Sequence, residues 1–203
     1  MEVVTHMKPI PYEVRQEYWK YQLAKFCFHG AERLCDRMIK ESISREDDVF
    51  YQLMLSTIVL YARPFKQRPP FRFPAILVPE NLKVCHEYLI MLRDKTVAHT
   101  DADSPELKGN VLNKIILTVL EDGNIISGIE GPNPSPPQLK EIRDLIHIVR
   151  EKAQYYVSKI WKKHMAKEII PPGRYEVNLD KGKGSLLVPY RKWDDYPLQK
   201  IDK

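Results

Sequence analysis

The sequence predicts a mainly α-helical protein: an antiparallel bundle of about four helices, with a small β-hairpin and an irregular C-terminal tail. Three observations predict this class. Apolar residues recur every three or four positions over long stretches, as they do along one face of a helix. Proline-rich segments separate these stretches, and proline ends helices. None of the apolar faces could be buried alone, so the helices must pack on one another.

The first two helices are predicted from apolar spacing and from residues that favour helix ends. The first helix extends from Tyr12 to about Ile43, and its apolar face contains Trp19, Leu23, Phe26, Leu34 and Met38. Ser44 is followed by acidic residues, which favour the start of a helix, so Ser44 is the predicted N-cap of the second. That helix should end near Arg63, because a proline follows.

The segment from Pro64 to Pro79 holds five prolines and three phenylalanines. So many prolines exclude a regular helix, whereas the phenylalanines are too apolar for a free linker. We therefore expect an ordered loop beside the third helix, with three rings at least half buried: Phe65, Phe71 and Phe73. Pro79 should open the third helix, whose apolar face continues to His99.

Residues 111–129 change to a β pattern. Two β-rich runs flank the pair Asp122-Gly123, a hairpin turn signal, so we expect a β-hairpin inserted into the bundle. A proline-rich connector then leads to the fourth helix, predicted from Gln138 to about Lys167.

Length and composition suggest one helical domain over 1–170 and a tail over 171–203. No apolar run approaches the roughly 20 residues needed to cross a bilayer, and the start lacks a secretory signal pattern. Three cysteines without metal spacing suggest reduced thiols, so we expect a cytoplasmic protein. A net charge of +5 is compatible with binding to a polyanion such as RNA. No glycine-rich phosphate loop is present, and we expect neither a cofactor nor a metal.

One short segment carries the functional hypothesis. Arg93 and His99 are separated by five residues in the run Leu92-Arg93-Asp94-Lys95-Thr96-Val97-Ala98-His99-Thr100-Asp101. This run resembles the R-x4-6-H signature of HEPN domains, including the polar residue after the arginine and the Ala-His-x-Asp ending. The end of the second predicted helix also resembles a stretch in the abortive-infection-like branch of that superfamily: Tyr61-Ala62-Arg63-Pro64-Phe65. The resemblance covers about Tyr12 to Lys167.

The resemblance implies a helical homodimer, commonly a metal-independent endoribonuclease of toxin, phage-defence or RNA-processing systems. Cleavage of RNA by its own 2'-hydroxyl needs an acid or base near neutrality and positive charge on the phosphate. By the resemblance, His99 would be the acid or base and Arg93 the phosphate clamp. Histidine titrates near neutral pH, and the arginine fork matches phosphate oxygens. Asp94 would orient the pair or the arginine alone.

Three further side chains are expected to contact RNA: Lys95, His86 and Arg63. An antitoxin or another regulatory protein is the expected partner, and a membrane is not. Two alternatives stay open. The chain could be a catalytically inactive module that binds RNA, nucleotide or protein, or a structural dimerisation domain whose Arg93 and His99 only join the subunits.

The position of His99 has other interpretations. It continues the apolar face of the third predicted helix, which also suits a buried or capping histidine. Arg93 would lie about 120° around the same helix, so one chain offers a poor site and two antiparallel copies a better one. As metal ligands, His99, Asp101 and Asp103 form a weak pattern in a polar run. Asp101 is better explained as a turn residue.

Overall fold

A computed structural model describes residues 10–94, 114–121, 124–130, 134–165, 175–176, 179 and 188–189. Within these residues there are four α-helices: α1 (Tyr12–Lys40), α2 (Asp48–Ala62), α3 (Lys83–Leu92) and α4 (Pro136–Ile160). The predicted mainly helical class and helical bundle are therefore confirmed. None of the helices in this part of the chain combines the length and the apolar character needed to span a membrane.

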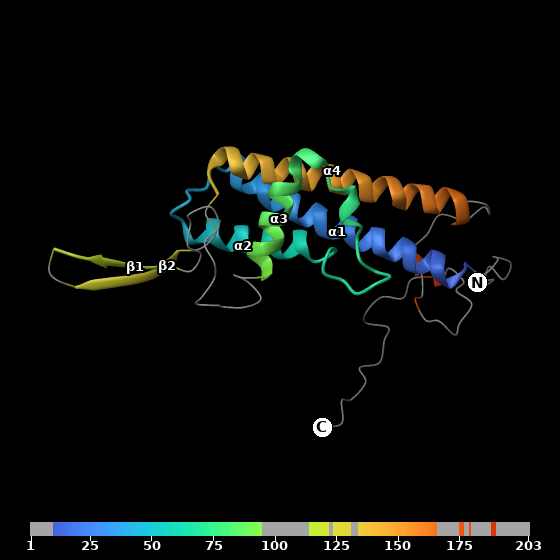
Figure 1. The fold of residues 1–203 in the computed structure, drawn as a ribbon, viewed down its shortest axis with the longest axis horizontal. Helices are drawn as coiled ribbons and strands as arrows, with labels where there is room; N and C mark the ends of the chain where they lie inside the picture. Colours follow the sequence, from blue (N-terminus) through green and yellow to red (C-terminus); the bar gives the residue numbers. More distant parts are fainter. Residues whose placement is uncertain are drawn as a thin grey trace, which may run out of the picture.

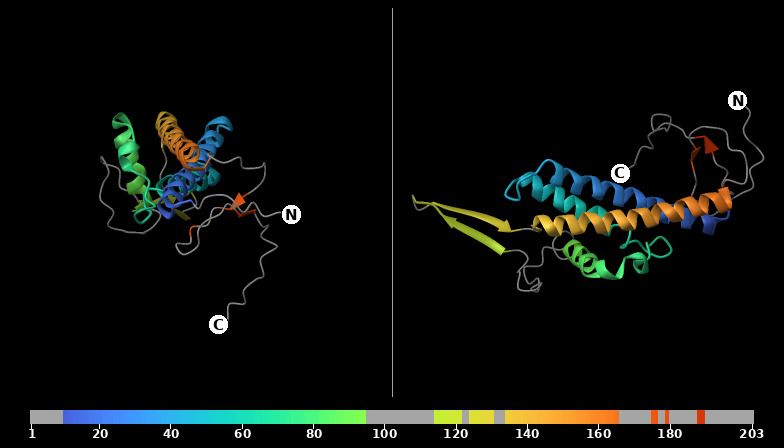
Figure 2. Two further views of the ribbon diagram at one scale, coloured as in Figure 1. Left: turned by 90° about the vertical axis from the view of Figure 1, so that its right-hand side faces the viewer. Right: turned by 90° about the horizontal axis from the view of Figure 1, so that it is seen from above.

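The bundle is organised around the long helix α1. Both α2 and α4 pack along α1 and run antiparallel to it, as the colours in Figure 1 show. Seen from above in Figure 2, α2 lies on one side of α4 and α3 lies on the other, while α1 crosses α4. Helix α3 crosses the bundle steeply and contacts both α2 and α4 (Figure 1). Its C-terminal end carries the residues of greatest functional interest.

The core lies where α1 meets its two neighbours. Apolar residues at helical spacing face inward, and none of the following side chains exposes more than 2% of its surface: Phe28, Cys35, Met38, Met54, Ile58, Ile142, Ile146 and Val149. Each large apolar side chain buried in this way stabilises the fold by about 1.5 to 3 kcal/mol. The helices are therefore held mainly by contacts between residues far apart in the sequence.

The loop between α2 and α3 packs on the bundle as predicted. Phe65 and Phe73 are buried, and Phe71 is partly buried with its ring 5.0 Å from that of Trp19. The prediction that all three phenylalanines are at least half buried is confirmed. Two short 3-10 turns, Ala75–Leu77 and Glu80–Leu82, complete the loop.

The N-cap of α2 is Asp47, so the prediction of Ser44 is wrong. The Asp47 carboxylate accepts a hydrogen bond from the backbone N–H of Val49 at 2.8 Å. The Ser44 hydroxyl instead accepts from the backbone N–H of Glu46, in the turn before the helix. Both residue types favour helix N-termini, and only the path of the turn decides between them.

Helices α3 and α4 begin a few residues from their predicted starts. Helix α3 begins at Lys83 rather than Pro79, because Glu80–Leu82 forms a 3-10 turn first. Helix α4 begins at Pro136, where the fixed φ of proline suits the first helical position. The predicted extension of the third helix to His99 lies outside the described residues. After α4, Trp161–Met165 forms a wider, π-helical turn.

Two antiparallel strand pairs accompany the helices. β1 (Lys114–Val119) pairs with β2 (Ile125–Glu130), from Lys114 opposite Glu130 to Val119 opposite Ile125. This ribbon extends beyond the end of the bundle where α4 begins (Figure 1). In the predicted irregular tail, β3 (Tyr175–Glu176) pairs with β4 (Val188–Pro189), so the tail is not wholly irregular. Tyrosine and valine at the start of these strands favour extended structure.

Candidate functional site

Arg93 lies at the C-terminal end of α3, in an ion-paired group with two other residues. Its Nη1 donates a hydrogen bond to Oδ1 of Asp94 at 3.0 Å. Lys66, from the turn after α2, donates to the other carboxylate oxygen of Asp94. The three side chains are each 35 to 38% exposed. We call Arg93, Asp94 and Lys66 the α3-end triad; it has a net positive charge and is open to solvent.

The α3-end triad keeps Asp94 ionised. Burial raises the pKa of Asp94, but hydrogen bonds from Lys66 and Arg93, together with their charges, outweigh burial and hold this pKa below its usual value. At neutral pH the carboxylate is therefore an acceptor only and has no proton to donate. Asp94 can orient the guanidinium of Arg93, as predicted for it, but cannot act as a general acid there.

His86 lies two turns before Arg93 on α3 and faces the end of α2. Its Nδ1 is 2.7 Å from the hydroxyl oxygen of the buried Tyr61, and its ring centroid is 4.6 Å from that of Phe65. Burial lowers the pKa of His86, and Lys66 lowers it further, against an opposing effect of Glu87. The pKa of Tyr61 is raised by burial.

His86 is mostly uncharged at neutral pH, because burial holds its pKa below the ordinary value. The Tyr61 hydroxyl can both donate and accept, so Nδ1 of His86 accepts from it in one tautomer and donates to it in the other. His86 therefore adds no fixed charge to the site, and its predicted RNA contact stays a prediction.

The pKa shift of His86 predicts a pH dependence of stability. The imidazole of His86 binds a proton more readily in the unfolded chain than in the folded chain, because its pKa is lower in the folded chain. The free energy of unfolding therefore falls as pH drops from about 6.5 through the lower pKa of the folded state. Urea unfolding at about pH 8 and about pH 5.5, on either side of the ordinary histidine pKa, measures the effect. His86→Gln should lose less stability over this range than the wild type. His164→Gln, at an exposed position, should follow the wild type; equal losses in all three proteins would contradict the prediction.

The other predicted site residues divide into two groups. Arg63 is the exposed C-cap of α2, and no hydrogen bond or ion pair joins it to Arg93, Asp94 or His86. Its charge acts on Cys27 of α1, where burial raises the thiol pKa and Arg63 lowers it. His99, Lys95, Asp101 and Asp103 lie outside the described residues. The structure therefore brings Arg93 and Asp94 together, with His86 two turns before them on the same helix.

Lys66 and Tyr61 are the site residues that sequence reasoning missed. Tyr61 lies in the stretch similar to the abortive-infection-like branch, but no role was assigned to it. Lys66 is 28 positions from Asp94, so no local spacing links the two. Within the described part of the chain, no group of three or more histidine, cysteine, aspartate or glutamate side chains could hold a metal ion.

Comparison with known proteins adds no family to this picture. No protein-family model matches the chain, and no curated protein or solved structure matches it either.

Proposed function

We propose that this chain is a metal-independent endoribonuclease of the HEPN type. It would act in the cytoplasm, in a toxin, phage-defence or RNA-processing role. The observation that carries the proposal is the α3-end triad. An arginine is held by an adjacent ionised aspartate at an exposed helix end, and a histidine follows at the spacing of the R-x4-6-H signature.

The α3-end triad is suited to binding a scissile phosphate. Only Nη1 of Arg93 is engaged with another described residue, so several of its five N–H donors are available to phosphate oxygens. Lys66 adds a second positive charge beside it. As the RNA 2'-hydroxyl attacks, negative charge grows on the phosphorane, and these two cations would stabilise that charge. His99 would transfer the proton, since Asp94 cannot donate one.

The proposal includes a homodimer. If the helical path of α3 continued to His99, six residues would turn it through about 240° from Arg93, too far for one compact site. Two antiparallel copies would bring two arginines and two histidines together, with one histidine as base and the other as acid. An antitoxin or regulatory protein is expected to cover the shared site that these arginines and histidines form. Light scattering at tens of micromolar should find a dimer; a monomer would remove this part of the proposal.

The test is whether purified protein cleaves RNA in excess EDTA, which removes divalent metal ions. We expect wild-type protein to cut, leaving 2',3'-cyclic phosphate ends. His99→Ala should reduce the rate by at least about 100-fold, the lower limit for removing a general acid or base. Arg93→Lys keeps the charge but loses the planar fork, so it should also be impaired. His164→Ala, an exposed histidine at the end of α4, is the matched control and should cut normally.

Two results would overturn the enzyme proposal. The first is that a panel of structured and single-stranded RNAs stays intact with and without divalent ions. The second is that cutting survives His99→Ala. If RNA binds but is not cut, and Arg93→Ala abolishes the binding, the inactive binding module takes the place of the enzyme.

A further inference from the structure

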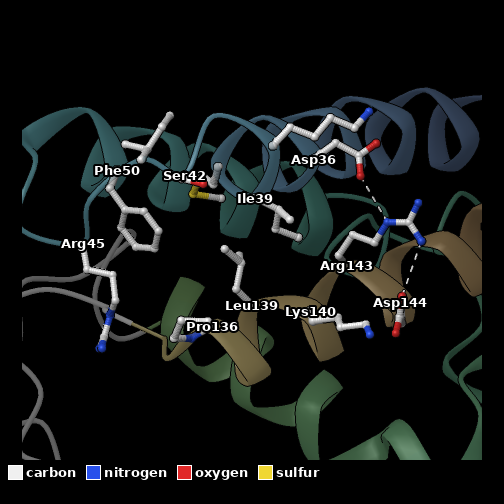
Figure 3. Close-up of a pocket in the computed structure, with 13 residues that line it drawn as sticks. Asp36, Ile39, Ser42, Arg45, Phe50, Pro136, Leu139, Lys140, Arg143 and Asp144 are labelled. Carbon is white, nitrogen blue, oxygen red and sulfur yellow. Dashed lines mark hydrogen bonds and ion pairs between the residues drawn. The ribbon is translucent and has the colours of Figure 1, made fainter.

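A pocket of about 530 Å³ lies away from the α3-end triad. It is formed by the C-terminal end of α1, the turn leading to α2 and the first turns of α4. Its volume is within the range of about 300 to 1,000 Å³ that is usual for small-molecule sites. Figure 3 shows Ile39 of α1 and Leu139 of α4 pointing toward one another across it.

The inner wall of the pocket is apolar. Met38, Phe50 and Leu139 line it but are only 2 to 5% exposed, whereas Ile39 is 42% exposed and Ile43 is partly exposed, so the two isoleucines offer most of the apolar surface. The turn after α1 closes one end: Ser42 has a φ of 47°, in the left-handed region, and the backbone N–H of Ile43 donates to the carbonyl of Met38 at 3.2 Å. This wall suits the apolar body of a ligand.

The rim of the pocket is basic. Four cationic side chains line it, against two carboxylates: Lys40, Arg45, Lys140 and Arg143, with Asp36 and Asp144. Arg143 donates to Asp36 at 3.2 Å and to Asp144 at 3.4 Å, so these two carboxylates share one cation (Figure 3). Lys40 and Lys140 are exposed and form no ion pair with any described residue. The rim therefore has positive charge available for a ligand.

We propose that this pocket binds a small amphipathic organic anion. Its apolar or aromatic body lies against Ile39, Ile43 and Leu139, and its phosphate, sulfonate or carboxylate group is held by Lys40 and Lys140. Complementary charge selects such a ligand over a neutral apolar one. An RNA backbone has no apolar body to fill the wall. The proposal uses neither Arg93 nor His99, so it stands independently of the endoribonuclease proposal.

The test is a fluorescence titration of the full chain with anilinonaphthalene sulfonate, which joins an aromatic body to one anionic group. We expect one molecule to bind per chain. The double variant Lys40→Gln/Lys140→Gln should weaken binding by about tenfold, the effect of losing two solvent-exposed ion pairs. Binding of the uncharged analogue phenylnaphthylamine should not change. Ile39→Glu places a carboxylate at a position that is 42% exposed, so it should weaken both probes without unfolding the protein.

The matched control is Lys162→Gln/Lys163→Gln, which removes the same charge at the opposite end of α4. It should bind the sulfonate probe like the wild type, and thermal melting should show all variants folded. Equal weakening in the control, unchanged binding in Lys40→Gln/Lys140→Gln, or no binding by wild type overturns the proposal. If decanoate displaces the sulfonate probe, the natural ligand has an acyl body. If adenosine monophosphate displaces the probe, the natural ligand has an aromatic body. If neither competes, the proposal is overturned.

Discussion

Replacing Phe73 by alanine is expected to lower the free energy of unfolding by about 3 to 5 kcal/mol, the cost of emptying a large aromatic site in a packed core. Phe73 has no exposed surface. Its ring meets those of Tyr21, Phe28 and Phe65 edge-on, with centroids 5.9, 5.2 and 5.4 Å away. Edge-to-face ring pairs stabilise a fold in addition to the apolar area that they bury. The loss of unfolding free energy should therefore lie toward the upper part of that range.

The same ring also holds the loop between α2 and α3 in place. The backbone N–H of Phe73 donates to the carbonyl of Pro64 at 3.0 Å, which closes the loop on itself, while the ring enters the core. Without the ring, the loop that carries Lys66 loses one of its anchors on α1 and keeps the contacts of Phe65 and Phe71 there. Phe73→Ala should therefore also weaken the α3-end triad, seen as faster proteolysis within the loop under native conditions.

Urea unfolding measures the loss, and Phe71→Ala is the matched control. Phe71 lies in the same loop but is only partly buried, against a single ring, that of Trp19. Its removal should cost roughly 1 kcal/mol, since less apolar area leaves water on folding. Similar losses in the two variants, or a loss below about 1 kcal/mol for Phe73→Ala, would show that the loop is not anchored as described.

The helices could be predicted from the sequence because their signals are local. Apolar residues at three and four positions placed α1 and α2 within a few residues of their observed bounds. The helix ends were harder to predict: Ser44 and Asp47 are both good N-caps, and only the turn that follows α1 makes Asp47 the acceptor. The burial of Phe73 followed from composition, but its position among two rings of α1 and one of its own loop did not.

The candidate site was predictable only in part. The motif pointed to Arg93 and Asp94 because those residues are adjacent, and their hydrogen bond is found. Lys66 was not predictable, because its contact depends on how the loop after α2 returns beside α3. The same applies to Glu32. On the sequence it reads as one charge among many on a long helix, whereas in the structure it is buried.

Glu32 is the centre of a charge network between α1 and α4. Its side chain is 6% exposed. Nδ1 of His147 lies 2.8 Å from Oε1, and Nη1 of Arg150 approaches Oε2 to 2.7 Å, but without hydrogen-bond geometry. Nη2 of Arg143 is farther away, at 3.7 Å from Oε1. Arg150 is thus the cation closest to the buried carboxylate, and the only one at Oε2 among the described residues.

Replacing Arg150 by methionine is therefore expected to lower the free energy of unfolding by about 3 kcal/mol. Removing one partner of a buried pair costs about 3 to 5 kcal/mol, because the other charge is left in a poorly solvated place. The loss of unfolding free energy for Arg150→Met should lie at the lower end of this range, since His147 and Arg143 remain beside Glu32. Methionine is about as long as the aliphatic part of arginine and keeps its packing, so the measured loss of stability comes from the removed charge.

The double variant Glu32→Leu/Arg150→Met separates this explanation from a simple loss of contacts. With the carboxylate gone, no uncompensated charge is buried, and most of the stability should return, although a pair of contacts has been removed. Arg143 keeps Asp36 and Asp144 as partners in that variant. Arg37→Met is the control, because Arg37 pairs with Glu41 at an exposed position and should cost less than about 1 kcal/mol. If urea unfolding finds the double variant as unstable as the sum of its single variants, the network stabilises through its contacts, and the buried charge of Glu32 is not the cause.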